Sequence, residues 1–265
     1  MKTNDFDIII IGGGHAGVEA ALVAARLGKS VALMTMEADK LAVMSCNPAV
    51  GGVGKSHIVK EIDALGGIMA RAADHAGIQF RRLNLSRGPA VWSTRVQCDR
   101  RDYNRFVCET VAAEPRIRVI EALAGAFIVE NSAVVGVRDE TGIEYACGAC
   151  IVATGTFLGG LIHIGQKSYQ SGRLNERAAY RLCESLLSLG FEVGRLKTGT
   201  PPRLNGETID FSTCQVQPGD TPAPLFSAFA NSISRPQVPC HLTYTTAETK
   251  RIISENLSTS AMFSG

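Results

Sequence analysis

Long apolar runs, a secretory leader and a dense set of cysteines are all lacking in this sequence of 265 residues. Each apolar run is interrupted by glycine or a charged residue well before the roughly 20 residues that a membrane-spanning helix needs. The first residues do not follow the basic, apolar, small-residue order of a signal peptide. These absences predict a cytoplasmic protein without a membrane segment.

Cysteine is present but thinly spread. The eight cysteines lack the density of a disulfide-stapled secreted domain, so we expect reduced thiols. Cys147 and Cys150 form a Cys-x-x-Cys pair, but no second pair has the spacing of a metal site. Because Cys150 begins an apolar run, we expect structural burial of this pair, and no metal site.

Positive charge is concentrated in one part of the chain. The net charge is only +2, and 20% of residues are charged. Residues 81–105 nevertheless contain seven arginines and two aspartates, with Trp92 and Tyr103 among them. This composition favours phosphate contacts and base stacking, and the competing interpretation is a solvated helix face with structural ion pairs. The candidate nucleic-acid contacts are Arg87, Arg95, Arg100 and Arg101.

An apolar run followed by three spaced glycines is the most informative feature of the sequence. Residues 7–11 predict a buried strand, residues 16–26 an alanine-rich helix and residues 30–35 a second strand. Between the first two, Gly12 permits a tight turn, Gly14 lets a pyrophosphate approach and Gly17 allows close helix packing. The helix N-terminus then faces the phosphates. The predicted cofactor contacts are Gly12, Gly13, Gly14, His15, Ala16 and Gly17.

Two positions in this unit leave alternatives open. A carboxylate at the end of the second strand normally binds the adenosine ribose. In this sequence Thr35 occupies that position, and the first acidic residue, Glu37, comes two residues later. Either Glu37 bends back to the ribose or Thr35 makes the contact, and we favour Glu37. His15 is more often a packing residue than a catalyst at such a helix start.

Later parts of the chain extend the α/β pattern. We expect a helix over 99–113, a strand over 116–121, a hairpin formed by 126–130 and 133–138, and a helix over 176–189. An apolar strand over 149–155 ends in Ala-Thr-Gly, a usual second fingerprint in flavoproteins with two dinucleotide domains. Two fingerprints in this order favour FAD over NAD alone, with Thr154 and Gly155 as further contacts.

Composition changes at Arg195, after which prolines cluster, strands look short and no helix is expected before about Ala247. We therefore predict a FAD-binding domain over 1–194 and an incomplete inserted domain, on the substrate and NADH side, over 195–265. The predicted fold class is α/β, a doubly wound Rossmann-like sheet of the glutathione-reductase type, followed by the start of a mixed, mainly β insertion. The chain then ends before any later segment that would close a ribityl pocket, so we expect an N-terminal portion.

A glycine-rich loop over 44–56 carries two further candidates. Residues 49–56 satisfy the loose form of a triphosphate-binding loop, but no buried strand precedes them, which disfavours that interpretation. Beyond the loop, apolar residues at helical spacing indicate a helix. Cys46 lies near the N-terminus of this expected helix and near Lys55 and His57. A helix N-terminus and positive charges stabilise a thiolate. Cys46 is therefore a candidate nucleophile or proton carrier beside a flavin, and the alternative is an inert loop cysteine.

Several segments together resemble one family. They are residues 12–17, Ser45 to Ala49, Asp63 to Gly67, Gly88 to Ala90, Gly155 to Leu158 and Arg195 to Arg203. On these segments the chain resembles the glucose-inhibited division protein A family, also called MnmG, the flavin subunit of a tRNA wobble-uridine modification enzyme. The resemblance runs from the first strand to Gly265. Trp92 stands where the family often has Arg, and Ala179 and Cys183 where Ser is common.

The resemblance implies a cytoplasmic FAD enzyme that adds a carboxymethylaminomethyl or aminomethyl group to C5 of the wobble uridine of certain tRNAs. It implies NADH and methylenetetrahydrofolate as co-substrates, glycine or ammonium as amine donor, and a homodimer that forms a heterotetramer with the GTPase MnmE. It places Cys46 at one of two functional cysteines, and Ala124 and Ala179 at cofactor contacts. The alternatives are a folate- and FAD-dependent tRNA uracil-C5 methyltransferase, a non-catalytic flavin-binding scaffold, and a triphosphate hydrolase using Lys55.

Overall fold

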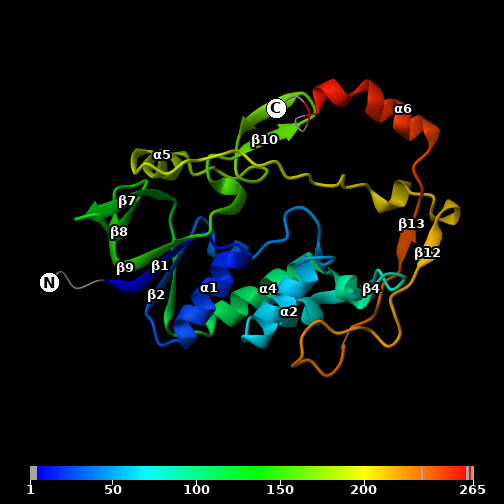
Figure 1. Ribbon diagram of the computed structural model, residues 1–265, viewed down its shortest axis with the longest axis horizontal. Helices are drawn as coiled ribbons and strands as arrows, with labels where there is room; N and C mark the ends of the chain where they lie inside the picture. Colours follow the sequence, from blue (N-terminus) through cyan, green and yellow to red (C-terminus); the bar gives the residue numbers. More distant parts are fainter. Residues whose placement is uncertain (1–4, 234, 261–262, 264–265) are drawn as a thin grey trace.

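A six-stranded sheet forms the centre of the computed structural model, which describes residues 5–233, 235–260 and 263 (Figure 1). The strand order is β6-β2-β1-β9-β8-β7. The first four of these strands run parallel, and β8 and β7 continue the sheet as an antiparallel hairpin beside β9. The bounds are β1 (Phe6–Ile11), β2 (Val31–Thr35), β6 (Ile117–Glu121), β7 (Ala124–Glu130), β8 (Ala133–Asp139) and β9 (Glu144–Val152).

Alternate residues of β1 and β2 enter two different cores. Ile10 and Leu33 lie in the core under the first helices, while Ile9, Ile11 and Met34 lie in the core on the opposite face. A parallel strand that is covered on both faces needs apolar side chains at every position. Residues 8–11 are accordingly four consecutive isoleucines. The α/β class predicted from the sequence is confirmed.

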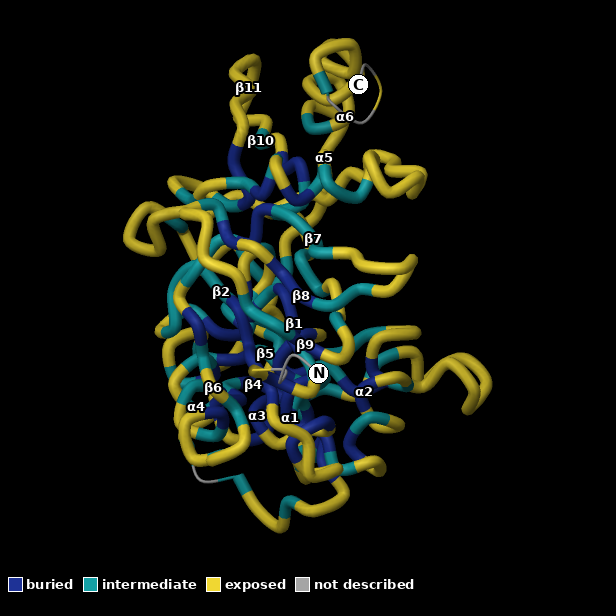
Figure 2. The backbone as a smooth tube through the Cα atoms, turned by 90° about the vertical axis from the view of Figure 1, so that its left-hand side faces the viewer, coloured by how far each residue is buried: buried dark blue, intermediate teal, exposed yellow. Residues whose placement is uncertain are grey.

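The helix α1 (His15–Arg26) packs on one face of the sheet, and a further helix lies on the other face (Figure 1). Three more helices share the core of α1: α2 (Lys55–Ala64), α3 (Met69–Ala76) and α4 (Arg100–Ala112). On the other face, α5 (Tyr180–Ser188) packs through Leu182 near β7. Figure 2 shows the buried residues gathered where these helices meet β1 and β2.

A second, three-stranded antiparallel sheet lies beside α2 and α3. It has the order β3-β5-β4, formed by β3 (Ala49–Gly51), β5 (Ser93–Cys98) and β4 (Gly77–Leu83). One face carries the buried residues Val50, Phe80 and Val96. These strands were not predicted, because β3 is only three residues long within a glycine-rich loop, and the arginines of β4 and β5 were interpreted as part of a basic surface.

Residues after α5 are mostly irregular. An extended segment over 191–205 crosses the molecule towards a small sheet of β12 (Gln215–Gln217) and β13 (Cys240–Leu242) (Figure 1). Two mostly exposed elements stand out in Figure 2. They are the hairpin of β10 (Leu161–Ile164) and β11 (Lys167–Gln170), and the helix α6 (Ala247–Glu255). In the described part of the chain no α-helix intervenes between α5 and α6, as predicted. The division into domains at residue 194 stays a prediction.

A segment from the predicted second domain enters the core of the first. Phe226 is only 1% exposed and belongs to the core that also contains residues of α1 to α4. Asp74 accepts the backbone N–H groups of Phe226 and Ser227, each at 2.8 Å. Asp63 accepts the Ser227 hydroxyl and the Ala228 N–H, also at 2.8 Å. Two buried carboxylates therefore fasten residues 226–228 to α2 and α3.

Most predicted elements are confirmed, with shifted ends. The hairpin turn lies at Asn131 and Ser132, both with positive φ, and α4 begins after its cap Asp99. The helix expected from residue 176 begins four residues later, at Tyr180. The helical pattern after residue 55 divides into α2 and α3, because the chain turns at Gly66 and Gly67. No described helix is both long and apolar enough to span a membrane.

We expect Phe226→Ala to lower the free energy of unfolding by about 3–5 kcal/mol, because it leaves a cavity in the shared core. Phe229→Ala is the matched control, since that ring is 64% exposed and its loss should change stability by less than about 0.5 kcal/mol. Urea unfolding followed by circular dichroism measures both. Equal effects would show that residues 226–228 are not part of the core.

Candidate cofactor site and the cysteine beside it

The carboxyl ends of β1, β2, β6 and β9 meet at one edge of the central sheet, because these strands are parallel. Backbone hydrogen bonds continue past the strand ends: Gly12 N–H donates to Met34 O at 2.9 Å and Ala153 N–H to Ile11 O at 2.8 Å. Ala122 N–H likewise donates to Thr35 O at 2.8 Å. The structure thus brings together the predicted contacts that follow these four strands. Ligands of open α/β sheets bind at this edge.

Two of the fingerprint glycines are needed for the packing of the backbone. Gly12 has φ +115°, and a Cβ there would lie 2.3 Å from Ala153 O. A Cβ on Gly17 would lie 1.8 Å from Gly12 O, so α1 can approach β1 only without one. Gly13 lies against Thr35, whose Oγ1 would be 2.8 Å from an added Cβ. These contacts agree with the roles predicted for Gly12 and Gly17.

Gly14 differs from these, because its added Cβ would meet no protein atom within 4 Å. Gly14 is the N-cap of α1, yet no side chain caps this helix and its first turn contains no acidic residue. The N–H groups of a first helical turn have no intrahelical acceptor. An open, uncapped helix start beside a residue without Cβ fits the pyrophosphate of a dinucleotide, bound by the backbone of residues 14–17.

His15 points into the protein interior. Its ring lies 5.6 Å from the ring of Tyr103, and its buried Nε2 has no hydrogen-bond partner. Burial, with a smaller contribution from the charge of Lys55, lowers the pKa of His15 to about 4. The imidazole is therefore neutral at pH 7. The geometry supports the packing interpretation for its side chain and leaves only its backbone N–H for a cofactor.

The choice between Thr35 and Glu37 for the ribose remains open. Glu37 lies two residues beyond β2, and its carboxylate is bound by Lys40 Nζ at 2.7 Å while 42% of the side chain stays exposed. Lys40 also approaches Glu176, at 3.4 Å. A ribose contact from Glu37 would therefore share that carboxylate with Lys40, whereas Thr35 already lies against Gly13.

The remaining predicted cofactor contacts lie around the end of β9. Gly155 has φ +54° and follows Thr154 in a tight turn. Ala179 is 3% exposed and donates its N–H to Phe157 O at 2.8 Å, which joins the start of α5 to this turn. Ala124 begins β7 and is 2% exposed, so only its backbone can face a ligand. Their roles as cofactor contacts stay predictions.

Cys46 lies in a loop that is tied to the glycine turn, since Ala42 N–H donates to Gly13 O at 2.8 Å. Two arginines from distant segments hold the loop. Arg203 Nη2 donates to Cys46 O at 3.0 Å, and Arg173 Nη1 lies 3.4 Å from Ser45 Oγ. Sequence reasoning did not single out either arginine. Arg203 is the last residue of the Lys-Thr-Gly-Thr-Pro-Pro-Arg segment, which carries part of the family resemblance and could have indicated it. Arg173 belongs to no motif of the sequence.

The loop over 49–56 does not have the arrangement of a triphosphate site. Strand β3 lies inside the motif and does not precede it. Lys55 Nζ donates to Ala49 O at 3.2 Å, so its ammonium is used within its own loop. Burial lowers the pKa of Lys55, while the neighbouring Cys98 and Cys46 thiols act in the opposite direction.

Several other cysteines are held in the protonated form. Burial raises the pKa of Cys98 and of Cys150 to about 12, and it also raises the pKa of Cys147. Cys147 lies in β9 and is 1% exposed. These observations support the structural interpretation of the Cys147 and Cys150 pair.

A family comparison matches almost the whole chain. Residues 7–265 match the model of the family described as glucose inhibited division protein A. The chain belongs to this family. It is 49% identical over 264 residues to the tRNA uridine 5-carboxymethylaminomethyl modification enzyme MnmG of Thermodesulfovibrio yellowstonii, covering 100% of this chain and 42% of that relative. The chain therefore spans less than half the length of this relative.

Solved structures agree with the family assignment. GidA of Aquifex aeolicus in its form I crystal superposes with a TM-score of 0.94 at 44% identity, covering 99% of this chain and 45% of that one. The GidA-related protein from Thermus thermophilus has a TM-score of 0.53 at 22% identity, covering 71% and 69%, which indicates a shared fold. The expected family resemblance is confirmed.

The four arginines proposed for nucleic-acid contact come from three successive segments of the chain. Arg87 lies in the loop before β5, Arg95 within β5, and Arg100 and Arg101 in the first turn of α4 after it. The six residues of β5 separate the two ends by roughly 20 Å. Arg87, Arg100 and Arg101 are exposed, whereas the nearby Arg105 pairs with Asp102 at 2.6 Å. The ion-pair interpretation thus fits Arg105, and nucleic-acid contact by the other four stays a prediction.

Replacing Gly14 tests the cradle without disturbing the fold. Because nothing lies within 4 Å of the added methyl, Gly14→Ala should keep the melting temperature of the cofactor-free protein. It should weaken dinucleotide binding by about tenfold or more, since the methyl group would keep the pyrophosphate from reaching the backbone N–H groups. Gly88→Ala, equally open but distant in sequence, should leave binding unchanged. Calorimetric titration with FAD measures both, and equal affinities would remove Gly14 from the site.

The buried imidazole predicts a pH dependence of stability. The pKa of His15 is about 4 in the folded protein and about 6.5 when unfolded, so protonation favours the unfolded chain. Stability should be unaffected by this group above about pH 6.5 and should fall by up to ~3 kcal/mol as the pH drops towards 4. His15→Asn should flatten this part of the curve in urea unfolding, and His163→Asn, on the exposed β10, should not. A parental slope in His15→Asn would contradict the prediction.

Proposed function

We propose that this chain is the FAD-binding, N-terminal portion of a cytoplasmic enzyme that modifies the wobble uridine of tRNA. The product is a carboxymethylaminomethyl or aminomethyl group at C5. The named relative from Thermodesulfovibrio yellowstonii supports the reaction class, since its name specifies tRNA uridine and this substituent. The fit of the uncapped α1 N-terminus to a pyrophosphate supports the cofactor.

The observation that carries the proposal is the attachment of the Cys46 loop to the glycine turn. A single backbone hydrogen bond, from Ala42 N–H to Gly13 O, joins the cofactor cradle to the loop with the candidate nucleophile. Arg203 and Arg173 hold the loop from the other side. These contacts support a role for the Cys46 thiol near the proposed FAD site.

FAD, when bound, supplies hydride transfer between NADH and a carbon unit taken from methylenetetrahydrofolate. The chain's own residues bind and orient. The backbone N–H groups of residues 14–17 would hold the pyrophosphate, and Thr154, Gly155 and Ala179 form the turns around the end of β9. Cys46 Sγ either attacks an electrophilic carbon or carries a proton, assisted by the nearby positive charge of Lys55.

The partners belong to the same proposal. We infer that the complete protein forms a homodimer and assembles with the GTPase MnmE, and that glycine or ammonium supplies the amine. A dependence on this GTPase distinguishes the proposed reaction from uracil-C5 methylation, and the product masses also differ. A flavin-binding scaffold would bind FAD and give neither product.

We expect Cys46→Ser in the full-length protein to retain FAD, shown by its visible absorption, and to lose turnover by at least about a hundredfold, because a hydroxyl is a much poorer nucleophile than a thiolate. Hypomodified tRNA, the GTPase, NADH and methylenetetrahydrofolate are supplied, and nucleoside mass spectrometry measures the product. Cys183→Ser, which changes a half-buried thiol elsewhere, is the control. Full turnover by Cys46→Ser would remove Cys46 from the chemistry, and a colourless parent protein would refute the cofactor assignment.

A further inference from the structure

The chain between β2 and the Cys46 loop bends sharply at Ala42. Ala42 has φ +48°, a left-handed conformation in which a Cβ crowds the following carbonyl oxygen. The bend is buried, since Leu41 is 1% exposed and Ala42 2%. Backbone strain of this kind persists only where the surrounding structure fixes the conformation. The contacts of Leu41 and Ala42 therefore show what holds the bend.

The peptide group that joins Leu41 to Ala42 is bound at both of its polar atoms. Its N–H donates to Gly13 O at 2.8 Å, and its carbonyl oxygen accepts a hydrogen bond from Asn104 Nδ2, also at 2.8 Å. A buried peptide group needs partners for its N–H and its carbonyl. These two bonds fix the peptide between the glycine turn and α4, directly before the left-handed residue.

Asn104 binds a second carbonyl of the same segment. Its Nδ2 also donates to Asp39 O at 3.0 Å. An amide nitrogen carries two hydrogens, so one side chain can serve both carbonyls. On the other side, Glu121 Oε1 of β6 accepts the Ala38 N–H at 2.8 Å. The short helical turn η1 (Ala38–Lys40) and the bend after it are thus held by α4 and β6 together.

Asn104 is a costly residue for its place in α4. Asparagine is less favourable inside a helix than arginine, lysine or glutamate, because its amide competes for nearby backbone groups. Here the amide is used outside the helix instead. The neighbouring Tyr103 and Val107 are buried in the core and fix the rotation of α4, so the amide of Asn104 is directed at one place.

The loop that carries Cys46 follows directly after the bend. Without the bond to Leu41 O, Ala42 would relax towards an ordinary negative φ, and the chain after it would take another direction. We propose that Asn104 is a positioning residue, whose amide holds Ala42 in the left-handed conformation and thereby sets the direction of the Cys46 loop. The importance of this loop for the reaction rests on the proposed function, whereas the clamp on residues 39–42 does not.

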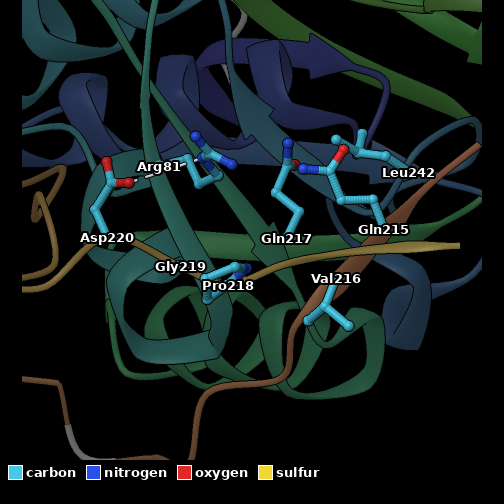
Figure 3. Close-up of a pocket in the computed structure, with 8 residues that line it drawn as sticks. All are labelled: Arg81, Gln215, Val216, Gln217, Pro218, Gly219, Asp220 and Leu242. Carbon is cyan, nitrogen blue, oxygen red and sulfur yellow. Dashed lines mark ion pairs between the residues drawn. The ribbon is translucent and has the colours of Figure 1, made fainter.

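The test compares Asn104→Ala with a matched control in the full-length protein, by hydrogen exchange and mass spectrometry. The control is Gln79→Ala, because Gln79 Nε2 also donates to a carbonyl of a distant segment, Gln217 O at 2.7 Å. Figure 3 shows Gln217 at a cleft that no residue of the segment 38–46 lines. Amides of residues 41–46 should exchange about tenfold faster or more in Asn104→Ala, since two hydrogen bonds no longer oppose local opening. Gln79→Ala should leave them at the parental rate.

Asn104→Asp distinguishes this clamp from a general loss of stability. At pH 7.5 its carboxylate has no hydrogen to donate, so exchange of residues 41–46 should be at least as fast as in Asn104→Ala. Near pH 4 the carboxyl group is partly protonated and can donate to one carbonyl again. The rate, divided by that of the parent at the same pH, should therefore fall as the pH is lowered, and Asn104→Ala should show no such recovery.

FAD binding and turnover of hypomodified tRNA are measured in parallel. Asn104→Ala should lower kcat about tenfold or more and leave the FAD affinity and the KM for tRNA near the parental values. Parental exchange of residues 41–46 in Asn104→Ala, an equal increase in Gln79→Ala, or no recovery of Asn104→Asp at low pH would overturn the clamp. Faster exchange with a parental kcat would overturn the positioning role. An inactive parent whose exchange still depends on Asn104 would refute the proposed function and leave the clamp standing.

Discussion

The close approach of α1 to the end of β1 is the constraint on which the rest of the structure depends. A Cβ on Gly17 would lie 1.8 Å from Gly12 O, so helix and strand meet at backbone distance. This contact fixes the open start of α1, and the Gly13 carbonyl then holds Ala42 and with it the loop that carries Cys46. Cofactor cradle and candidate nucleophile are thus positioned by one backbone junction.

Carboxylates on the helices also hold the structure together, by binding backbone N–H groups of segments that are distant in sequence. Glu19 of α1 accepts the N–H groups of Ile68 and Met69 and so caps α3, even though burial raises its pKa. Asp63 and Asp74 bind the backbone around Phe226 in the same manner. Buried carboxylates that accept several N–H groups stabilise irregular segments which have no ladder of their own.

The site could be predicted where its geometry is local. Strand, glycine spacing and helix follow one another within about 20 residues, and the positions of Gly12 and Gly17 follow from the absence of a Cβ. The strands β4 and β5 were not predicted, although the alternation of Phe80 and Val96 with glutamine and arginine is a local signal of a strand. Their pairing in one sheet with β3 joins segments far apart in the chain and could not be predicted from local pattern.

The sequence by itself determined the α/β class, the strand-glycine-helix unit and the family, because the apolar period, the glycine spacing and short motifs depend on residues that are close in the chain. Only the tertiary structure decided which arginines have partners. Arg203 reaches Cys46 across 157 positions of sequence, and Arg81 faces Arg95 through strand pairing. Such contacts depend on how the elements are arranged in space, and side-chain type alone carries no information on that arrangement.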